Sequence, residues 1–243
     1  MVNTMSVLEK LRVRIFADTS KPSEIERFAR NPLIKGFTTN PTLMRASDVK
    51  DYERFARWVI EIAGERPVSF EVTSDDFDEM IREAQVIASW GSNVNVKIPV
   101  TNTRGEFAGR VIETLSSEGI VVNVTAVMTI TQVQHIAKVL SRDVPAIVSI
   151  FAGRIADTGK DPVWHMMMAR TVFKSRPWVS LLWASPRELL NIFQAVRAGC
   201  DIITCTSAIL AKFDLVGKNL TEYSLETVRM FHRDAREAGF EIL

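Results

Sequence analysis

Apolar runs and charged segments alternate along the chain. Short strand-like runs begin near Val13, Ile34, Pro67, Asn93, Ile120, Val144, Trp178 and Asp201. Amphipathic segments with helical spacing follow them, at residues 22–30, 49–63, 77–90, 104–118, 130–140, 162–175, 186–198 and about 224–238. Eight strand-then-helix cycles in 243 residues predict one domain, residues 1–243, folded as a (β/α)8 TIM barrel. An open doubly wound sheet is the alternative fold.

The fourth predicted strand carries a lysine near its end. Alternation puts Val94, Val96 and Ile98 on one face and Asn93, Asn95 and Lys97 on the other. Pro99 ends the strand pairing, so Lys97 lies at the carboxyl end of the strand. Active sites of β/α barrels are built at that end, and we expect Lys97 to be a catalytic amine there. A solvated lysine is the ordinary alternative.

Composition excludes several classes of function. Thirty basic and 29 acidic residues give a net charge of +1, so no strong field directs the protein to nucleic acid or to a membrane surface. No apolar run approaches the ~18 residues that span a bilayer. Residues 1–14 mix Glu9, Lys10, Arg12 and Arg14 with isolated apolar residues, which is not the pattern of a signal peptide.

Cysteine and histidine positions give no sign of a metal site. Cys200 and Cys205 lie near a predicted strand, without a CxxC motif or a Cys/His cluster, so we expect reduced thiols in a cytoplasmic protein. His135, His165 and His232 fall in different predicted helices of the outer ring. We therefore expect no metal site.

Seven consecutive predicted strands end in polar or ionisable groups. In a barrel these ends converge on one pocket. They read Phe16-Ala17-Asp18, Gly36-Phe37-Thr38-Thr39-Asn40-Pro41-Thr42, Phe70-Glu71, Val96-Lys97, Asn123-Val124-Thr125, Ser149-Ile150-Phe151-Ala152-Gly153-Arg154 and Trp183-Ala184-Ser185-Pro186-Arg187.

These stretches closely resemble the transaldolase and fructose-6-phosphate aldolase superfamily. The resemblance runs from about Ile15 to Thr204. It rests on the order and spacing of four motifs: Thr-Thr-Asn-Pro, Val-Lys-Ile-Pro, Asn-Val-Thr and Gly-Arg-Ile-Ala-Asp. It implies a barrel with a Schiff-base lysine on the fourth strand, sugar-phosphate substrates, a homo-oligomer, and no cofactor or metal requirement.

The resemblance also implies a role for each catalytic residue. Lys97 would attack the C2 carbonyl of a ketose phosphate and form an iminium that accepts electrons when the C3–C4 bond breaks. That step needs a neutral amine, so burial has to lower the lysine pKa from its usual ~10.4. Asp18 matches the acid/base for the C4 hydroxyl, and Glu71 and Thr125 match a pair that holds a water and relays protons.

The implied substrate contacts form two groups. Asn40, Asn123 and Ser149 match positions that bind the hydroxyls of the dihydroxyacetone unit. Arg154, Ser185 and Arg187 match phosphate-binding positions, where two guanidinium groups and a hydroxyl suit an anion.

Two positions favour the transaldolase branch of the superfamily. Transaldolase-type members have phenylalanine at the position of Phe151, where the aldolases have a tyrosine whose hydroxyl helps water to intervene. Glu71 agrees, because the aldolase branch has glutamine there. Pro186 departs from the transaldolase pattern Ala-Ser-Phe-Arg, so a ketose with another anionic group, such as a sulfonated one, is an alternative substrate.

Other readings of these residues stay open. An aldolase that releases free dihydroxyacetone is the enzymatic alternative, and a barrel that only binds phosphosugars is the non-enzymatic one. Asp18 could cap the next helix, and Arg154 and Asp157 could form a loop ion pair. We interpret Thr38, Thr39 and Pro41 as residues that shape their loop rather than contact substrate. The segment from Phe213 to Tyr223 is either a cover over the pocket or a subunit contact.

Overall fold

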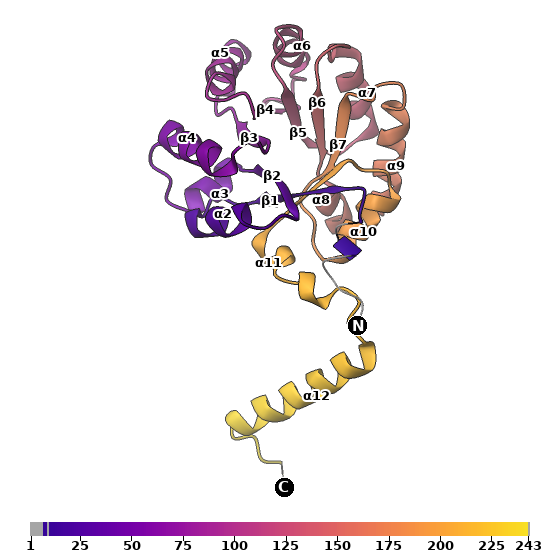
Figure 1. Cartoon of the computed structure of the whole chain (residues 1–243). Helices are drawn as coiled ribbons and strands as arrows, with labels where there is room; N and C mark the ends of the chain where they lie inside the picture. Colours follow the sequence, from indigo (N-terminus) through magenta and orange to yellow (C-terminus); the bar gives the residue numbers. More distant parts are fainter. Residues whose placement is uncertain (1–6, 9, 243) are drawn as a thin grey trace.

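The computed structural model describes residues 7–8 and 10–242 and contains a closed barrel of eight parallel strands in sequence order (Figure 1). The strands are β1 (Arg14–Asp18), β2 (Ile34–Thr38), β3 (Val68–Glu71), β4 (Val94–Pro99), β5 (Val122–Val127), β6 (Ala146–Ile150), β7 (Val179–Trp183) and β8 (Ile202–Cys205). β1 pairs with both β2 and β8, which closes the sheet. The prediction of a (β/α)8 barrel is therefore confirmed, and the open sheet is excluded.

Most of the helices surround the barrel, and their bounds follow the predicted segments only in part. They are α2 (Pro22–Ala29), α3 (Pro41–Ala46), α4 (Tyr52–Ala63), α5 (Phe77–Ala88), α6 (Gly109–Ser117), α7 (Ile130–Val139), α8 (Ala152–Asp157), α9 (Pro162–Val172), α10 (Leu190–Arg197), α11 (Ser207–Leu210) and α12 (Leu220–Glu237). A 3₁₀ turn covers Phe213–Leu215.

Two apolar cores hold the barrel together. The larger lies between the strands and the helix ring, where outward strand residues such as Val96 and Ile98 are fully buried. A smaller one inside the barrel consists of Phe16, Ile147, Leu182, Ala184 and Ile202. A Cβ atom at Gly36 would lie 2.6 Å from the ring of Phe16, so glycine at this position makes room for the ring. Phe16 and its neighbours fill the interior, as in other barrels of this size.

Several predicted helix boundaries were wrong. α3, α8 and α11 were not predicted, because they are too short to show a periodic pattern. The predicted helix 186–198 begins at Leu190 instead of Pro186, and the predicted helix 104–118 begins at Gly109. In the second case Thr101 and Phe107 form an isolated antiparallel bridge, which occupies the expected first turn.

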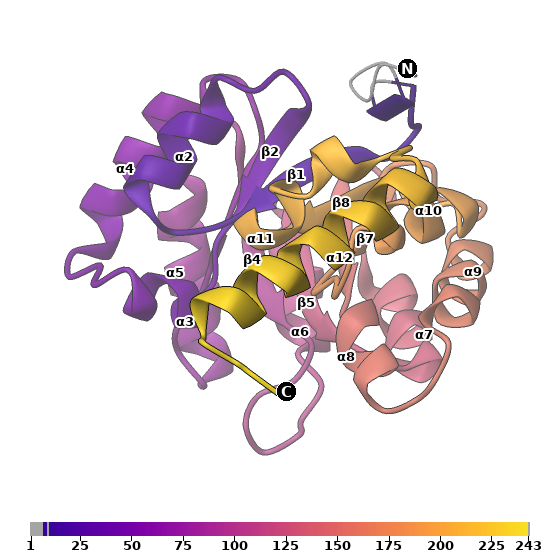
Figure 2. The same cartoon turned by 90° about the horizontal axis from the view of Figure 1, so that it is seen from below.

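The last helix is the largest departure from the prediction. The segment 224–238 was predicted as the eighth helix of the outer ring, but the short α11 follows β8 at that place. α12 instead projects away from the barrel (Figure 1), and in the view from below it crosses in front of the barrel (Figure 2). None of the eighteen described residues of α12 is buried. His232, which lies in α12, is therefore not on the outer ring of helices.

Some predictions concern absences. In the described part of the chain, no helix is long and apolar enough to cross a membrane. Among residues 7–8 and 10–242, no group of three or more His, Cys, Asp or Glu side chains could hold a metal ion. Cys200 and Cys205 are buried free thiols. The predicted lack of a signal peptide concerns residues 1–14, of which 1–6 and 9 lie outside the described residues.

Candidate active site

A pocket of about 640 Å³ lies at the carboxyl ends of the barrel strands. It collects every residue predicted for the site: Asp18, Asn40, Glu71, Lys97, Asn123, Thr125, Ser149, Phe151, Arg154, Ser185 and Arg187. These residues come from β1 through β7, from the loops that follow the strands and, for Arg154, from α8. The convergence follows from the parallel barrel, in which all strands point their carboxyl ends to one face.

Lys97 is buried and paired with Glu71. Its Nζ atom lies 2.7 Å from Glu71 Oε2 and donates a hydrogen bond of 2.9 Å to the backbone oxygen of Thr39. The strand register explains the pairing, because Glu71 of β3 and Asn123 of β5 stand directly beside Lys97 of β4. Glu71 can therefore take the proton that the amine must lose before it attacks a carbonyl group.

Thr125 supplies a hydroxyl group on the next strand. Its Oγ1 atom is buried, and no described residue hydrogen-bonds to it. Thr125 pairs in register with Pro99, just beyond Lys97 on β4. A buried hydroxyl that lines a polar pocket is suited to bind a water or a substrate oxygen there.

Asp18 belongs to a chain of hydroxyl groups. Thr38 Oγ1 donates a hydrogen bond of 2.7 Å to Asp18 Oδ1 and lies 2.5 Å from Thr204 Oγ1. A hydroxyl has one proton, so when Thr38 donates to Asp18, Thr204 donates to Thr38. Burial raises the pKa of Asp18, and the charge of Lys97 and the Thr38 hydrogen bond oppose this shift less strongly. A carboxyl group with a raised pKa is suited to exchange protons near neutral pH.

The alternative role of Asp18 as a helix cap is wrong. α2 begins at Pro22, and its cap position, Lys21, makes no side-chain capping bond. Thr38, which we interpreted as a residue that shapes its loop, is the last residue of β2; its side chain binds Asp18 and lines the pocket, and Pro41 lines the pocket as well. Thr38 lies two positions after Gly36, on the inward face of β2, and this alternation could have identified it.

Amide and hydroxyl groups are linked across the floor of the pocket. Ser149 donates to Asn123 Oδ1 at 2.7 Å, and Asn123 Nδ2 donates to Ser69 Oγ at 3.1 Å. These bonds fix the orientation of the Asn123 amide. Asn40 accepts a hydrogen bond of 3.0 Å from the backbone N–H of Leu43, so it also caps α3.

The basic residues lie at the rim. Arg187 makes a two-point ion pair with Asp157, with Nε lying 2.9 Å from Oδ1. Asp157 thus pairs with Arg187 rather than with Arg154, the partner that the alternative reading gave it. The Arg154 guanidinium instead lies over the ring of Phe151, 5.5 Å from its centre.

The loop that carries Ser185 has an unusual backbone. Ser185 has a φ of 59°, in the left-handed region. A Cβ atom at Gly153 would lie 1.5 Å from the Ser185 carbonyl oxygen, so α8 and the loop that carries Ser185 approach as closely as they do only with glycine at position 153. This contact sets the position of Ser185 and Arg187 relative to Arg154.

Comparisons with known proteins agree with this geometry. The sequence signature of the family Transaldolase/Fructose-6-phosphate aldolase matches residues 15–242. A probable transaldolase of Carboxydothermus hydrogenoformans is 33% identical over 202 residues, covering 82% of this chain and 89% of the relative. A probable transaldolase of Hyphomonas neptunium is 33% identical over 234 residues, covering 95% and 100%.

A solved structure shares the fold. A monomeric variant of dihydrodipicolinate synthase superposes with a TM-score of 0.59 at 18% identity, over 93% of this chain and 80% of that one. At that identity the likeness concerns the barrel alone. The sequence matches are the stronger finding, since they span nearly the whole chain and include the strand ends that line the pocket. The chain therefore belongs to the transaldolase/fructose-6-phosphate aldolase family.

Proposed function

We propose that the protein is a transaldolase. It transfers a dihydroxyacetone unit from a ketose phosphate, such as fructose 6-phosphate, to an aldose acceptor through a Schiff base on Lys97. The observation that carries the proposal is the buried pair of Lys97 and Glu71, 2.7 Å apart, in a pocket that also contains Asp18 and Thr125. The names of the relatives support the same activity.

The first half of the reaction attaches the donor to the enzyme. Glu71 accepts a proton from Lys97, and the free amine adds to the C2 carbonyl carbon. The resulting carbinolamine loses water, and a water held between Glu71 and Thr125 relays the protons. The product is an iminium ion joined to Nζ, and the positive nitrogen draws electrons from the neighbouring carbon.

The second half moves the three-carbon unit. Asp18 removes the proton of the C4 hydroxyl, the C3–C4 bond breaks, and the electron pair passes to the iminium and forms an enamine. The aldehyde product leaves. The enamine carbon then attacks the acceptor aldehyde, Asp18 returns the proton to the new hydroxyl, and hydrolysis frees Lys97. Asn123 and Ser149, already linked to each other, bind the hydroxyls of the unit.

Retention of the enamine decides between transfer and release. Phe151 has no hydroxyl and packs against the inner core of Phe16, Ile147, Leu182, Ala184 and Ile202. An apolar ring beside the reacting carbon gives water no hydrogen-bonding partner there. We therefore favour transfer over the aldolase alternative, in which free dihydroxyacetone is released.

The rim residues are proposed to bind the anionic group of the substrate. Arg154 and Arg187 carry guanidinium groups that suit a phosphate, and Ser185 adds a hydroxyl. A sulfonated ketose offers three oxygens in a similar arrangement and is the alternative donor. We further propose a cytoplasmic location, where the two buried thiols would stay reduced.

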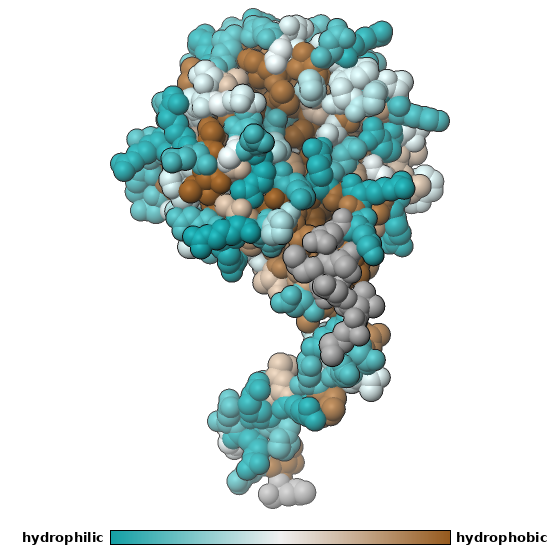
Figure 3. All heavy atoms as spheres, in the orientation of Figure 1, coloured by the Kyte–Doolittle hydropathy of each residue, from teal (hydrophilic) through white to brown (hydrophobic). Residues whose placement is uncertain are grey.

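We propose that the protein is a homo-oligomer and that α12 makes the contact. At 100° per residue, Leu220, Tyr223, Val228 and Phe231 share one side of α12, while Glu222, Arg229 and Arg233 share the other. The apolar side is exposed, and apolar residues interrupt the hydrophilic surface of the projecting arm (Figure 3). Most of the stability of a helix in a protein comes from packing of its apolar side, so we expect a second copy to cover the apolar side of α12.

One experiment tests the function. Fructose 6-phosphate is supplied with and without erythrose 4-phosphate, and glyceraldehyde 3-phosphate and free dihydroxyacetone are measured. We expect product only with the acceptor, and none from Lys97→Met. Dihydroxyacetone without acceptor would support the aldolase. Binding without turnover, and without a borohydride-trapped adduct on Lys97, would support the phosphosugar-binding barrel.

A further inference from the structure

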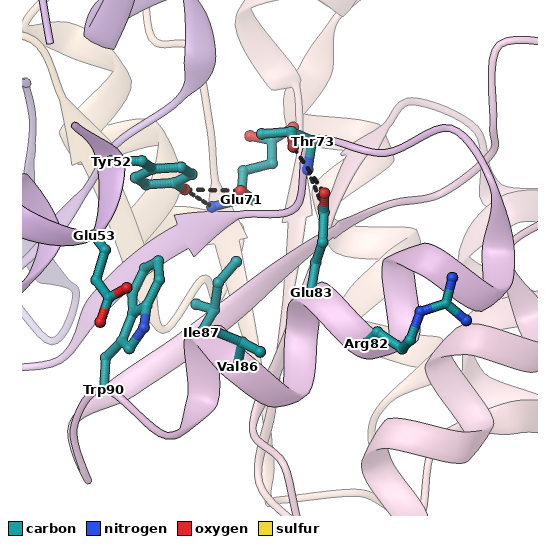
Figure 4. A pocket seen from close by; sticks show the side chains of 9 residues that line it. All are labelled: Tyr52, Glu53, Glu71, Thr73, Arg82, Glu83, Val86, Ile87 and Trp90. Carbon is teal, nitrogen blue, oxygen red and sulfur yellow. Dashed lines mark hydrogen bonds between the residues drawn. The ribbon is translucent and has the colours of Figure 1, made fainter. Parts of the chain in front are cut away.

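Glu71 lies between two cavities. It lines the large pocket with Lys97, and it also lines a second cavity of about 370 Å³ between α4 and α5 (Figure 4). Tyr52, Val86, Ile87 and Trp90 form much of the wall of this outer cavity. The strand end that carries Glu71 is therefore the partition between the proposed active site and the outer side of the barrel.

The hydroxyl of Tyr52 holds both backbone polar groups of Glu71. It donates a hydrogen bond of 2.7 Å to the Glu71 carbonyl oxygen and accepts one of 2.9 Å from the Glu71 N–H. Figure 4 shows both bonds and the Glu71 backbone that they join. Burial raises the pKa of Tyr52, so its hydroxyl stays protonated and able to donate.

On the side of Glu71 that faces Tyr52, the sheet provides no strand partner. β2 and β3 pair only at Phe37 with Val68 and at Thr38 with Ser69. β2 then ends, and the chain turns into α3 at Pro41. On the opposite side the ladder continues, since the Val72 N–H donates to the Lys97 carbonyl oxygen at 3.2 Å. The Tyr52 hydroxyl thus replaces the missing strand on one side of Glu71.

Packing fixes the Tyr52 ring. Its ring contacts Phe70 and Trp90 edge-on, with centres 6.3 and 5.6 Å apart. Tyr52 is the first residue of α4, whose cap Asp51 accepts a hydrogen bond from the Arg54 N–H at 3.0 Å. The hydroxyl is therefore held on a rigid element, which is what precise positioning of a second residue requires.

We propose that Tyr52 is a positioning residue for Glu71. By holding the Glu71 peptide, its hydroxyl keeps the carboxylate within reach of the Lys97 amine. The catalytic consequence rests on the proposed function, but the control of the Glu71–Lys97 contact does not. Loss of the hydroxyl would let the strand end move, and displacements of about 1 Å at a reacting group can cost roughly a hundredfold in rate.

The test compares Tyr52→Phe with two controls. Tyr52→Phe keeps the ring and removes the hydroxyl. Trp90→Phe weakens the ring packing and keeps the hydroxyl. Tyr223→Phe changes the chain's other tyrosine, which lies in α12. All variants are studied below their melting temperatures, and Tyr52→Phe is also made in a Glu71→Gln background.

Two rates are measured. The first is methylation of Lys97 by formaldehyde and cyanoborohydride at one mildly alkaline pH, followed by peptide mass spectrometry. The amine and formaldehyde form an imine with loss of water, and hydride reduces it, so this readout needs no sugar substrate. We expect Tyr52→Phe to raise labelling about threefold, because a loosened carboxylate leaves more of the amine free. We expect no further rise in the Glu71→Gln background.

The second rate is that of the transfer reaction. We expect Tyr52→Phe to lower kcat about tenfold and to change the KM for the ketose phosphate less than about twofold. Unchanged labelling in Tyr52→Phe would overturn the proposal, as would an equal change in Trp90→Phe, which would assign the effect to packing. Changed labelling in a protein that shows no turnover would contradict the proposed function and support the positioning role.

Discussion

Arg187 and Asp157 hold each other in a two-point ion pair at the rim of the large pocket. Arg187 Nε lies 2.9 and 3.2 Å from the two carboxylate oxygens of Asp157, and its Nη2 also bonds Oδ2. This contact lowers the pKa of Asp157, so the carboxylate stays charged at neutral pH. An anionic substrate group bound as proposed would meet an arginine whose direction is already set, and would share it with a carboxylate.

Loss of the Arg187 side chain should weaken binding of the anionic group. Charge-assisted hydrogen bonds contribute about 1.5–3 kcal/mol, so we expect Arg187→Ala to raise the KM for the ketose phosphate about tenfold or more. Turnover of an uncharged ketose at high concentration should change much less. Initial rates with both donors check this.

A matched control uses another exposed ion pair. Arg110 pairs with Asp78 on the outer helices, away from the pocket lining. Arg110→Ala should leave the KM and the turnover unchanged for both donors. An equal loss of activity with the charged and the uncharged donor in Arg187→Ala would contradict an anion-binding role and would indicate a general change in the loop.

Alanine at position 153 should destabilise the contact between α8 and the loop that carries Ser185. Its Cβ would lie 1.5 Å from the backbone oxygen of Ser185, and a backbone atom cannot move aside as a side chain can. Overpacking of this kind costs about 1–3 kcal/mol or more. We expect Gly153→Ala to lower the melting temperature by several degrees and to raise the KM. At Gly109 the atoms nearest to an added Cβ belong to the movable ring of Phe107, so Gly109→Ala should lower the melting temperature less.

The buried Asp18 carboxyl should make stability depend on pH. Its folded-state pKa is raised above the ordinary value of 3.8, so the folded protein binds this proton more tightly than the unfolded chain. The resulting stabilisation is complete below the unfolded pKa and is lost as pH rises through the folded pKa. We therefore expect Asp18→Asn to raise the melting temperature at neutral pH. The difference in melting temperature between Asp18→Asn and the wild type should shrink near pH 4. The rate of the transfer reaction should fall roughly a hundredfold or more in this variant.

The Thr38 hydroxyl should influence the pKa of Asp18. Its hydrogen bond lowers the Asp18 pKa, so Thr38→Val should raise that pKa further. The proposed reaction needs the ionised carboxylate, and the acidic limb of kcat/KM should therefore move to higher pH. Thr38→Ser keeps the hydroxyl and should restore the wild-type profile. A Thr38→Val profile that is lowered but not shifted would contradict this role.

The barrel was predictable from the sequence because each strand and most helices carry their own pattern. Strand starts were predicted within two residues, as at Val13 for β1 and Val144 for β6. The position of α12 was not predictable. Its periodicity is that of an ordinary surface helix, and the pattern identifies an apolar face without identifying what covers it.

The lining of the candidate site was predictable where strand ends carry distinctive polar residues, as with Lys97 and Asp18. It was missed where a role depends on tertiary contacts. The bond from Tyr52 to Glu71 joins residues 19 positions apart, and it exists because β2 separates from β3 beyond Ser69. Thr204 meets Thr38 only because β8 closes the barrel near β2. No local pattern reports such contacts.

α12 offers a test of assembly that leaves the barrel untouched. Phe231 is 63% exposed and lies on the apolar side of the helix, and Arg229 lies on the charged side. Burying a large apolar side chain contributes about 1.5–3 kcal/mol, so a glutamate in its place should weaken each contact by roughly tenfold to a hundredfold. We expect Phe231→Glu to shift the molar mass measured by light scattering toward the monomer.

Two further variants test whether the apolar side of α12 makes the subunit contact. Arg229→Glu changes charge on the opposite side and should keep the wild-type mass. A chain shortened after Lys218 lacks α12 entirely and should be monomeric at concentrations where the full chain is assembled. Every residue predicted for catalysis precedes position 218, so the shortened chain should still form a borohydride-trapped adduct on Lys97. An unchanged mass in both Phe231→Glu and the shortened chain would show that α12 does not make the subunit contact.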